Sequence, residues 1–325
     1  MKKLLKFSGL ILGIFFLAYA FYYVNWRDFL NSIEHINIFW FVLTGTAFTI
    51  SMFLRSVRWQ IIIGLPRSAT AKVWEAACVG YLGNAIYPAR AGDALKVLRL
   101  KNITNISSGL AFGSLIIDRI LDGLGLCALI ILSIIFWNKL FHIPSSIWLV
   151  AALFLFTSCL IVLLCYKGHY FEAIFSWCTR KFTKAKWIEE LYRQSLTGLM
   201  VLKSSHLIFK CLIAQLFITT FDILTCWLLL YAFGWTELPF FASIVMLIYL
   251  AAAFSLPSTP GYVGVYQIAA VLALSSFGIE KSAAIAYGTV LQTLTFVLFL
   301  GFGLPAQLRK FKESEPDLLH GIEKI

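Results

Sequence analysis

Three charged side chains stand inside one apolar stretch, residues 110–137. Asp118, Arg119 and Asp122 are separated by spacings of three and four, which place them on one flank of a helix. At the centre of a membrane helix each charge costs about 2.5–3.5 kcal/mol. We expect the cluster to line a polar pathway, because charges inside a membrane usually mark one. The alternatives are an ion cluster that pins helix packing, or a DxxxD metal site for prenyl or phosphatidyl transfer, although the longer acidic motifs of such enzymes are missing.

Further arginines could join this cluster. Arg55 and Arg58 end the apolar stretch 38–63 and, three residues apart, face one way. The guanidinium fork can bond two oxygens of one phosphate, so Arg55, Arg58, Arg90 and Arg119 together predict a site for an anion. The alternative for the first pair is that both extend toward the cytoplasmic interface, as basic residues at helix ends commonly do.

A broken stretch, residues 83–93, supplies Arg90. Asn84 and Pro88 end one short apolar segment, and Gly92 allows the next to begin close by. In hydrocarbon, such a break is tolerated only where it is buried in protein or lines a wet cavity. Asp93, Lys96 and Arg99 then form a polar stripe; Asn84, Asp93 and Arg99 are predicted site residues, although a solvated helix would show the same stripe.

A second broken stretch lies in the other half of the chain. It is rich in proline and glycine, and Gln267, which follows it, could reach a headgroup; the alternative is a kinked helix with a glycine-rich packing face. Asp222, within the apolar stretch 207–233, could carry a coupling proton or pair with an arginine, or could be a protonated packing residue. The predicted breaks in this stretch are Pro257, Pro260, Gly261 and Gly264.

Composition sets the elements that must position these residues. The 325 residues are 60% hydrophobic and 13% charged, which indicates an all-α polytopic membrane protein. The net charge of +11 comes from basic residues clustered in loops, a pattern of topology signals that does not suggest nucleic acid as a partner. Seven cysteines without a CxxC pair predict neither a disulfide framework nor a metal site. We expect no cofactor.

The predicted organisation is a single membrane domain, 1–325, with two inverted repeats. Each repeat has three full transmembrane helices and one re-entrant broken-helix hairpin, and the paired breaks point to a transporter-like site. The alternative is that the hairpins cross fully. Residues 25–37 are expected to be a slightly acidic outer loop. The predicted ranges are helices 4–24, 38–63, 110–137, 147–166, 207–233 and 282–304, hairpins 73–87 with 93–103 and 240–256 with 265–277, repeats 1–140 and 147–306, a cytoplasmic amphipathic segment 167–206 and a cytoplasmic tail 307–325.

Four motifs in order along the chain carry a family resemblance. The sequence resembles the lysylphosphatidylglycerol synthase transmembrane-region family, also called the flippase-like domain. The resemblance implies a flippase-type membrane domain, which in some relatives is fused to an aminoacyl-lipid synthase. Gln267 stands where the family commonly has Glu, which puts in doubt a mechanism that needs an acid there. The motifs are Arg55-x-x-Arg58-Trp59, Gly83-Asn84-x-x-x-Pro88-x-Arg90-x-Gly92-Asp93, Asp118-Arg119-x-x-Asp122-Gly123 and Pro257-x-x-Pro260-Gly261-x-x-Gly264.

These observations predict a lipid translocase, not an enzyme. Its substrate would be an anionic, phosphate-bearing membrane lipid of the phospholipid or polyprenyl-phosphate type. The expected location is the inner membrane of a prokaryote, with both termini in the cytoplasm. A soluble lipid-modifying enzyme or a second copy of the chain could be a partner. The alternatives are an integral-membrane enzyme acting on a lipid-linked substrate and a membrane scaffold for a soluble synthase.

Overall fold

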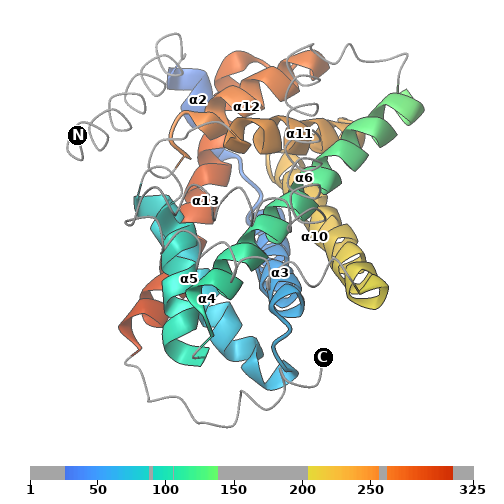
Figure 1. Cartoon of the computed structure of the whole chain (residues 1–325). Helices are drawn as coiled ribbons and strands as arrows, with labels where there is room; N and C mark the ends of the chain where they lie inside the picture. Colours follow the sequence, from blue (N-terminus) through green and yellow to red (C-terminus); the bar gives the residue numbers. More distant parts are fainter. Residues whose placement is uncertain (1–25, 88–90, 105, 138–203, 256–261, 310–325) are drawn as a thin grey trace, which may run out of the picture.

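The computed structural model describes residues 26–87, 91–104, 106–137, 204–255 and 262–309, and within them every regular element is a helix (Figure 1). The predicted all-helical fold is confirmed for this part of the chain. The predicted helices 4–24 and 147–166, the amphipathic segment up to residue 203 and the tail from residue 310 lie outside it. The elements are α2 (Trp26–Glu34), α3 (Ile38–Ile63), η1 (Arg67–Ala69), α4 (Thr70–Ile86), α5 (Ala91–Thr104), α6 (Ser108–Trp137), α10 (Ser205–Ala232), α11 (Phe241–Ser255), α12 (Val265–Leu274), η5 (Ser275–Phe277) and α13 (Lys281–Leu308).

Among the described residues, three helices are long and apolar enough to cross a membrane: α3, α10 and α13. Local sequence explains where α3 begins and ends. The Asn37 side chain accepts hydrogen bonds from the N–H groups of Phe39 and Trp40, which caps the first turn. Gly64 ends the helix with a φ of 79°, a left-handed conformation that glycine adopts without steric cost.

Helix α2 corrects one prediction. The sequence around Arg27, Asp28 and Glu34 was expected to form an outer loop, but Trp26–Glu34 is helical. Its apolar residues include Phe29 and Ile33, which are four apart and share a helix face. Phe29 is buried against α13, so packing on a neighbouring helix stabilises a segment whose charges suggest a loop.

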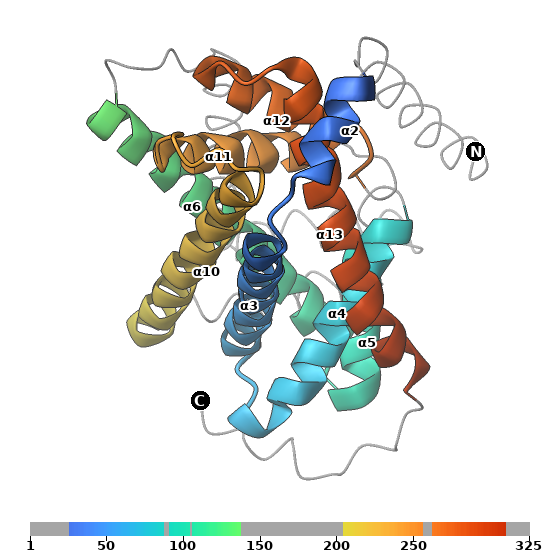
Figure 2. The same ribbon diagram turned by 180° about the vertical axis from the view of Figure 1, so that it is seen from behind.

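Two pairs of short helices lie at opposite ends of α13 (Figures 1 and 2). The pair α4 and α5 packs near its C-terminal end, and the pair α11 and α12 lies toward its N-terminal end. Helices α3 and α10 pack along one another, and α6 crosses the molecule obliquely. Among the described residues, the α-helices α3 to α6 and α10 to α13 therefore show the same order of lengths: one long helix, two short helices and one long helix.

Glycines allow α4 and α5 to approach closely. A Cβ atom added to Gly92 would overlap the carbonyl oxygen of Gly80 and the backbone nitrogen of Asn84. A Cβ atom added to Gly80 would lie 2.7 Å from the Cβ atom of Lys96. The contact between these helices thus depends on missing side chains, and it fixes the height of Lys96 and Asp93 relative to α4.

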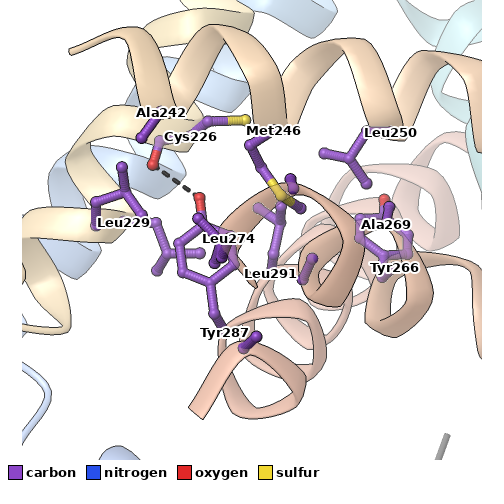
Figure 3. Packing of buried hydrophobic residues seen from close by; sticks show 14 of the residues in the cluster. Cys226, Leu229, Ala242, Met246, Leu250, Tyr266, Ala269, Leu274, Tyr287 and Leu291 are labelled. Atoms are coloured by element: carbon purple, nitrogen blue, oxygen red, sulfur yellow. Dashed lines mark hydrogen bonds between the residues drawn. The ribbon is translucent and has the colours of Figure 1, made fainter. Parts of the chain in front are cut away.

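Side chains fill most of the space between α10, α11, α12 and α13 (Figure 3), and the backbones of α12 and α13 approach one another at Gly288. Met246 and Tyr287 are fully buried at the centre of this cluster, beside Leu229 and Leu291. The Tyr287 hydroxyl donates a hydrogen bond of 2.8 Å to the carbonyl oxygen of Cys226, so the buried phenol is satisfied. The predicted break that precedes α12 is consistent with Gly264, whose φ is 82°.

Candidate functional site

A cavity of about 280 Å³ lies among α3, α4, α5, α6, α10, α11, α12 and α13. It borders both short-helix pairs and all four long helices. The wall combines charged side chains with apolar and aromatic ones. The charged residues that border it are Arg55, Asp93, Lys96, Asp118, Arg119, Asp122 and Asp222.

Arg58 forms the buried centre of the charge network. Its side chain is 0% exposed, and Nε and Nη2 donate to Oδ1 of Asp118 at 3.0 and 2.7 Å. Nη2 also donates to Oδ1 of Asp122 at 2.9 Å, and Nη1 donates to Oε1 of Gln215. Arg58 therefore joins α3, α6 and α10 through protein partners, and the cavity lining does not include it.

Arg55 lies one turn before Arg58 and reaches the cavity. Its Nη1 is 3.0 Å from Oδ1 of Asp122, and its Nη2 is 2.5 Å from Oδ2 of Asp222. The Ser51 hydroxyl donates to the other oxygen of Asp222 at 2.5 Å. Because 29% of the Arg55 side chain is exposed, this guanidinium can contact both the network and a ligand.

Arg119 is the most exposed of the paired cations that border the cavity, at 41%. Its Nη2 donates to both oxygens of Asp93 at 3.0 Å, and its Nη1 lies 3.4 Å from Oδ2 of Asp122. Asn84 Nδ2 donates to Oδ1 of Asp93 at 3.3 Å. The Asn84 Oδ1 atom is buried and has no hydrogen-bond partner among the described residues, so it could accept from a donor placed in the cavity.

Lys96 is a cavity residue that the predicted site lacked. Its ammonium is 3.7 Å from Oδ2 of Asp118 and 3.9 Å from the centroid of the Trp59 ring. The polar stripe that it forms with Asp93 and Arg99 was visible in the sequence, but the stripe does not tell which member turns inward. Gln215 was also absent from the predicted site, and the structure places it at the cavity, where its Oε1 accepts a hydrogen bond from Arg58.

The network is balanced in charge. It contains four cations and four carboxylates. Each of its three arginines contacts two of the carboxylates. Such pairing is expected because an unpaired charge is costly away from water. The charges are the cations Arg55, Arg58, Lys96 and Arg119 and the anions Asp93, Asp118, Asp122 and Asp222.

Two predicted site residues lie elsewhere in the described structure. Arg99 is bound to Glu75 at 2.5 Å and donates to the carbonyl oxygens of Ala306 and Arg309, so it caps the C-terminal end of α13. Gln267 Oε1 accepts from the backbone N–H of Gly264 at 3.0 Å. Neither side chain borders the cavity.

The amide nitrogen of Gln267 is also occupied. It donates to Thr289 at 3.2 Å and to Gln292 at 2.8 Å, so this side chain ties α12 to α13. In the part of the chain that the structure describes, no group of three or more His, Cys, Asp or Glu residues could hold a metal ion. The predicted residues that lie outside the described ranges are Pro88, Arg90, Pro257, Pro260 and Gly261.

Most of the chain matches one known protein family. Residues 7–303 match the family described as the lysylphosphatidylglycerol synthase TM region. The chain belongs to this family. The match covers nearly all of the chain and confirms the family that the four motifs predicted. No curated protein and no solved structure matches the chain.

Membership of the lysylphosphatidylglycerol synthase TM region family makes the chain a multi-pass membrane protein. It also makes the chain a membrane domain linked to lipid modification or transport. The charge network consequently lies in helices that belong to a membrane, with Arg55 and Arg58 in α3 and Asp222 in α10. Charged residues within membrane helices usually face the interior of the bundle or a water-filled cavity and mark functional sites.

Proposed function

We propose that this protein is a translocase that moves an anionic, phosphate-bearing lipid between the two leaflets. The observation that carries the proposal is the cavity, where Arg55 and Arg119 are held by aspartates yet remain partly exposed. Two guanidinium groups that border one space can bind a phosphate through charge-assisted hydrogen bonds. A cavity of about 280 Å³ suits a headgroup, while most of the lipid tail stays in the bilayer.

The aspartates have a role in release. An anion bound to unpaired arginines in a low-dielectric site would dissociate slowly. Asp93 and Asp122 are already hydrogen-bonded to Arg119, so a phosphate that binds Arg119 exchanges for part of these carboxylate contacts. This exchange keeps the net gain on binding small and allows the lipid to leave. Asp222 is the proposed coupling residue, because a proton on its carboxylate would loosen its pair with Arg55.

The two short-helix pairs are the proposed gates. Their helices have 17, 14, 15 and 10 residues, fewer than the roughly 20 that cross a bilayer. We infer that both are re-entrant hairpins of inverted repeats, about 1–140 and 147–306, that open alternately to the two leaflets. Arg55 and Asp222, which pair across the two halves, stand the same number of residues from the starts of α3 and α10.

Both termini would lie in the cytoplasm and the protein in the inner membrane of a prokaryote, as the basic flanks of the apolar stretches predict. The protein would be a transporter, not an enzyme. A soluble lipid-modifying enzyme would supply or consume the lipid that it moves.

Lipid scrambling in sealed liposomes tests the proposal. Purified wild type and Arg119→Ala are compared with fluorescent phosphatidylglycerol and with a polyprenyl phosphate; Arg67→Ala, at an exposed position of η1, is the matched control. We expect wild type and the control to move one probe, and Arg119→Ala to slow it by about tenfold or more, the value of one charge-assisted hydrogen bond. Wild-type rates in folded Arg119→Ala, or movement of neither probe by folded wild type, would contradict the proposal.

A further inference from the structure

The cavity changes character along its length. On α6, Asp118, Arg119 and Asp122 are followed by Leu126 and Leu129, which also border the cavity. From Asp122 to Leu129 the helix advances by about 10 Å. On α3, in the same way, Phe48 lies two turns before Arg55. The charged end therefore gives way to an apolar end on both helices.

Helices α11 and α13 complete the apolar end. Leu247, Leu250 and Phe254 come from α11, and Phe299 of α13 stacks on Tyr81 at 5.4 Å between ring centroids. The Phe254 ring contacts the Tyr266 ring at 5.1 Å. Among the described residues, the second half of the chain thus contributes Asp222 as its one charge in the wall; most of its other wall residues are apolar or aromatic.

The polar groups at the apolar end already have partners in the protein. Thr225 donates to the carbonyl oxygen of Phe221 at 2.8 Å, and the hydroxyls of Tyr266 and Thr295 are 3.1 Å apart. A glycerol or amine group placed there would lose water and gain few hydrogen bonds, which is unfavourable. An apolar chain placed there would lose only contact with water, which is favourable.

These features distinguish two kinds of phosphate-bearing lipid. In a phospholipid, the phosphate is a diester with polar groups on both sides: the headgroup alcohol and the ester-linked glycerol. In a single-chain lipid phosphate, the phosphate is joined directly to an apolar chain. In the second, the apolar chain begins at the phosphate ester itself, whereas in a phospholipid the polar glycerol and its ester groups come first. The wall that follows the charged end is already apolar at Leu126, one helical turn after Asp122.

We propose that the substrate is a single-chain lipid phosphate of the polyprenyl-phosphate type, an inference that rests on the proposed translocase function. The phosphate contacts Arg55 and Arg119. The first isoprene units lie against the leucines and aromatic rings of α6, α11 and α13. The rest of the chain remains in the bilayer.

The test compares two lipids in the same proteoliposomes. A long-chain polyprenyl phosphate is followed by its hydrolysis with a membrane-impermeant phosphatase added outside, and fluorescent phosphatidylglycerol by quenching with external dithionite. We expect wild type to make the whole polyprenyl-phosphate pool accessible, about tenfold faster than it moves phosphatidylglycerol. Phosphatidylglycerol moving equally fast or faster would overturn the inference and leave the translocase function standing. Movement of neither lipid would overturn the translocase function itself.

A pair of α6 variants tests the placement of the chain. Leu129→Asn puts an amide into the apolar end, whereas Leu132→Asn puts the same group on an exposed position of the same helix, outside the cavity lining. We expect Leu129→Asn to slow polyprenyl-phosphate movement about tenfold and Leu132→Asn to leave it unchanged. Equal rates for both variants would overturn the placement. If Leu129→Asn does not fold, the wild-type comparison of the two lipids still decides the substrate class.

Discussion

The two short-helix pairs occupy corresponding places in their halves but differ in chemistry. Helices α4 and α5 carry Glu75, Asp93, Lys96 and Arg99, each with an opposite charge as partner. Helices α11 and α12 contain no Asp, Glu, Lys or Arg. The first pair supplies charges to the cavity and the second supplies leucines and aromatic rings. The shared order of helices thus determines which elements line the cavity, while the residues on those elements determine which chemical groups the lining can bind.

The pairs also differ in how they are held. Backbone meets backbone between α4 and α5, at Gly80 and Gly92. Around α11 and α12 most of the contact is made by interlocking side chains such as Met246 and Tyr287 (Figure 3), although the backbone of α12 also approaches α13 closely at Gly288. We therefore expect the charged side of the molecule to tolerate substitution less than the apolar side. Four variants test this difference and are given in order of decreasing expected loss.

Removal of Arg58 should have the largest effect. Arg58→Ala leaves Asp118 and Asp122 without their buried cation, which should cost about 3–5 kcal/mol of folding free energy. We expect little monodisperse protein on size-exclusion chromatography in detergent, with Arg67→Ala indistinguishable from wild type. An Arg58→Ala protein with the wild-type melting temperature would show that the network does not stabilise the fold.

A methyl group at Gly92 should have the next largest effect. In Gly92→Ala the new Cβ atom meets the backbone of Gly80 and Asn84, which cannot move aside as a side chain can. We expect a loss of about 1–3 kcal/mol in thermal denaturation and slower lipid movement, because Asp93 and Lys96 are displaced. Gly301→Ala is the control, since nothing lies within 4 Å of the added atom. Equal melting temperatures for the two variants would contradict the predicted backbone contact.

Gln267 can be tested for two roles, as a cap at the start of α12 and as a contact to the lipid substrate. The two roles predict different effects on stability and on lipid movement. Gln267→Leu removes the partner of the Gly264 N–H and the bonds to Thr289 and Gln292, and should cost about 1–2 kcal/mol of stability. Lipid movement per folded molecule should be unchanged, because this side chain does not border the cavity. Loss of movement at an unchanged melting temperature would instead make Gln267 a substrate contact.

The smallest effect is expected on the apolar side. Tyr287→Phe removes the hydrogen bond to the Cys226 carbonyl and keeps the ring in place, which should cost about 1 kcal/mol. Transport should equal that of wild type. A larger loss of stability than in Gly92→Ala would reverse the ranking of the two regions.

The sequence predicted the described long helices to within a few residues. Asn37 and Gly64 mark the ends of α3, and apolar length identifies α6, α10 and α13. Helix α2 was missed because the charges of Arg27, Asp28 and Glu34 were given more weight than the helical spacing of Phe29 and Ile33, the face that packs against α13. Most charged residues of the site could be identified from the sequence, because a charged residue within an apolar stretch stands out.

The contacts that each site residue makes were harder to predict than the site residues themselves. The polar stripe on α5 contains both Lys96 and Arg99, but only Lys96 faces the cavity while Arg99 turns to α13. Their separation depends on how α5 is rotated against α4, which the glycine contacts decide. The pairing of Arg55 with Asp222 likewise depends on the relative height of α3 and α10, helices far apart in the sequence.

The fastening of α13 has a mechanical consequence. This helix of 28 residues is about 40 Å long, and it contacts α12 near one end and α4 near the other. Arg99 secures its far end through two carbonyl oxygens and Glu75. Such a helix behaves as a stiff lever, so a displacement of α12 would be felt at α4. The two proposed gates, which pack on opposite ends of α13, could in this way be coupled so that they are never open together, which would prevent a continuous pore from forming.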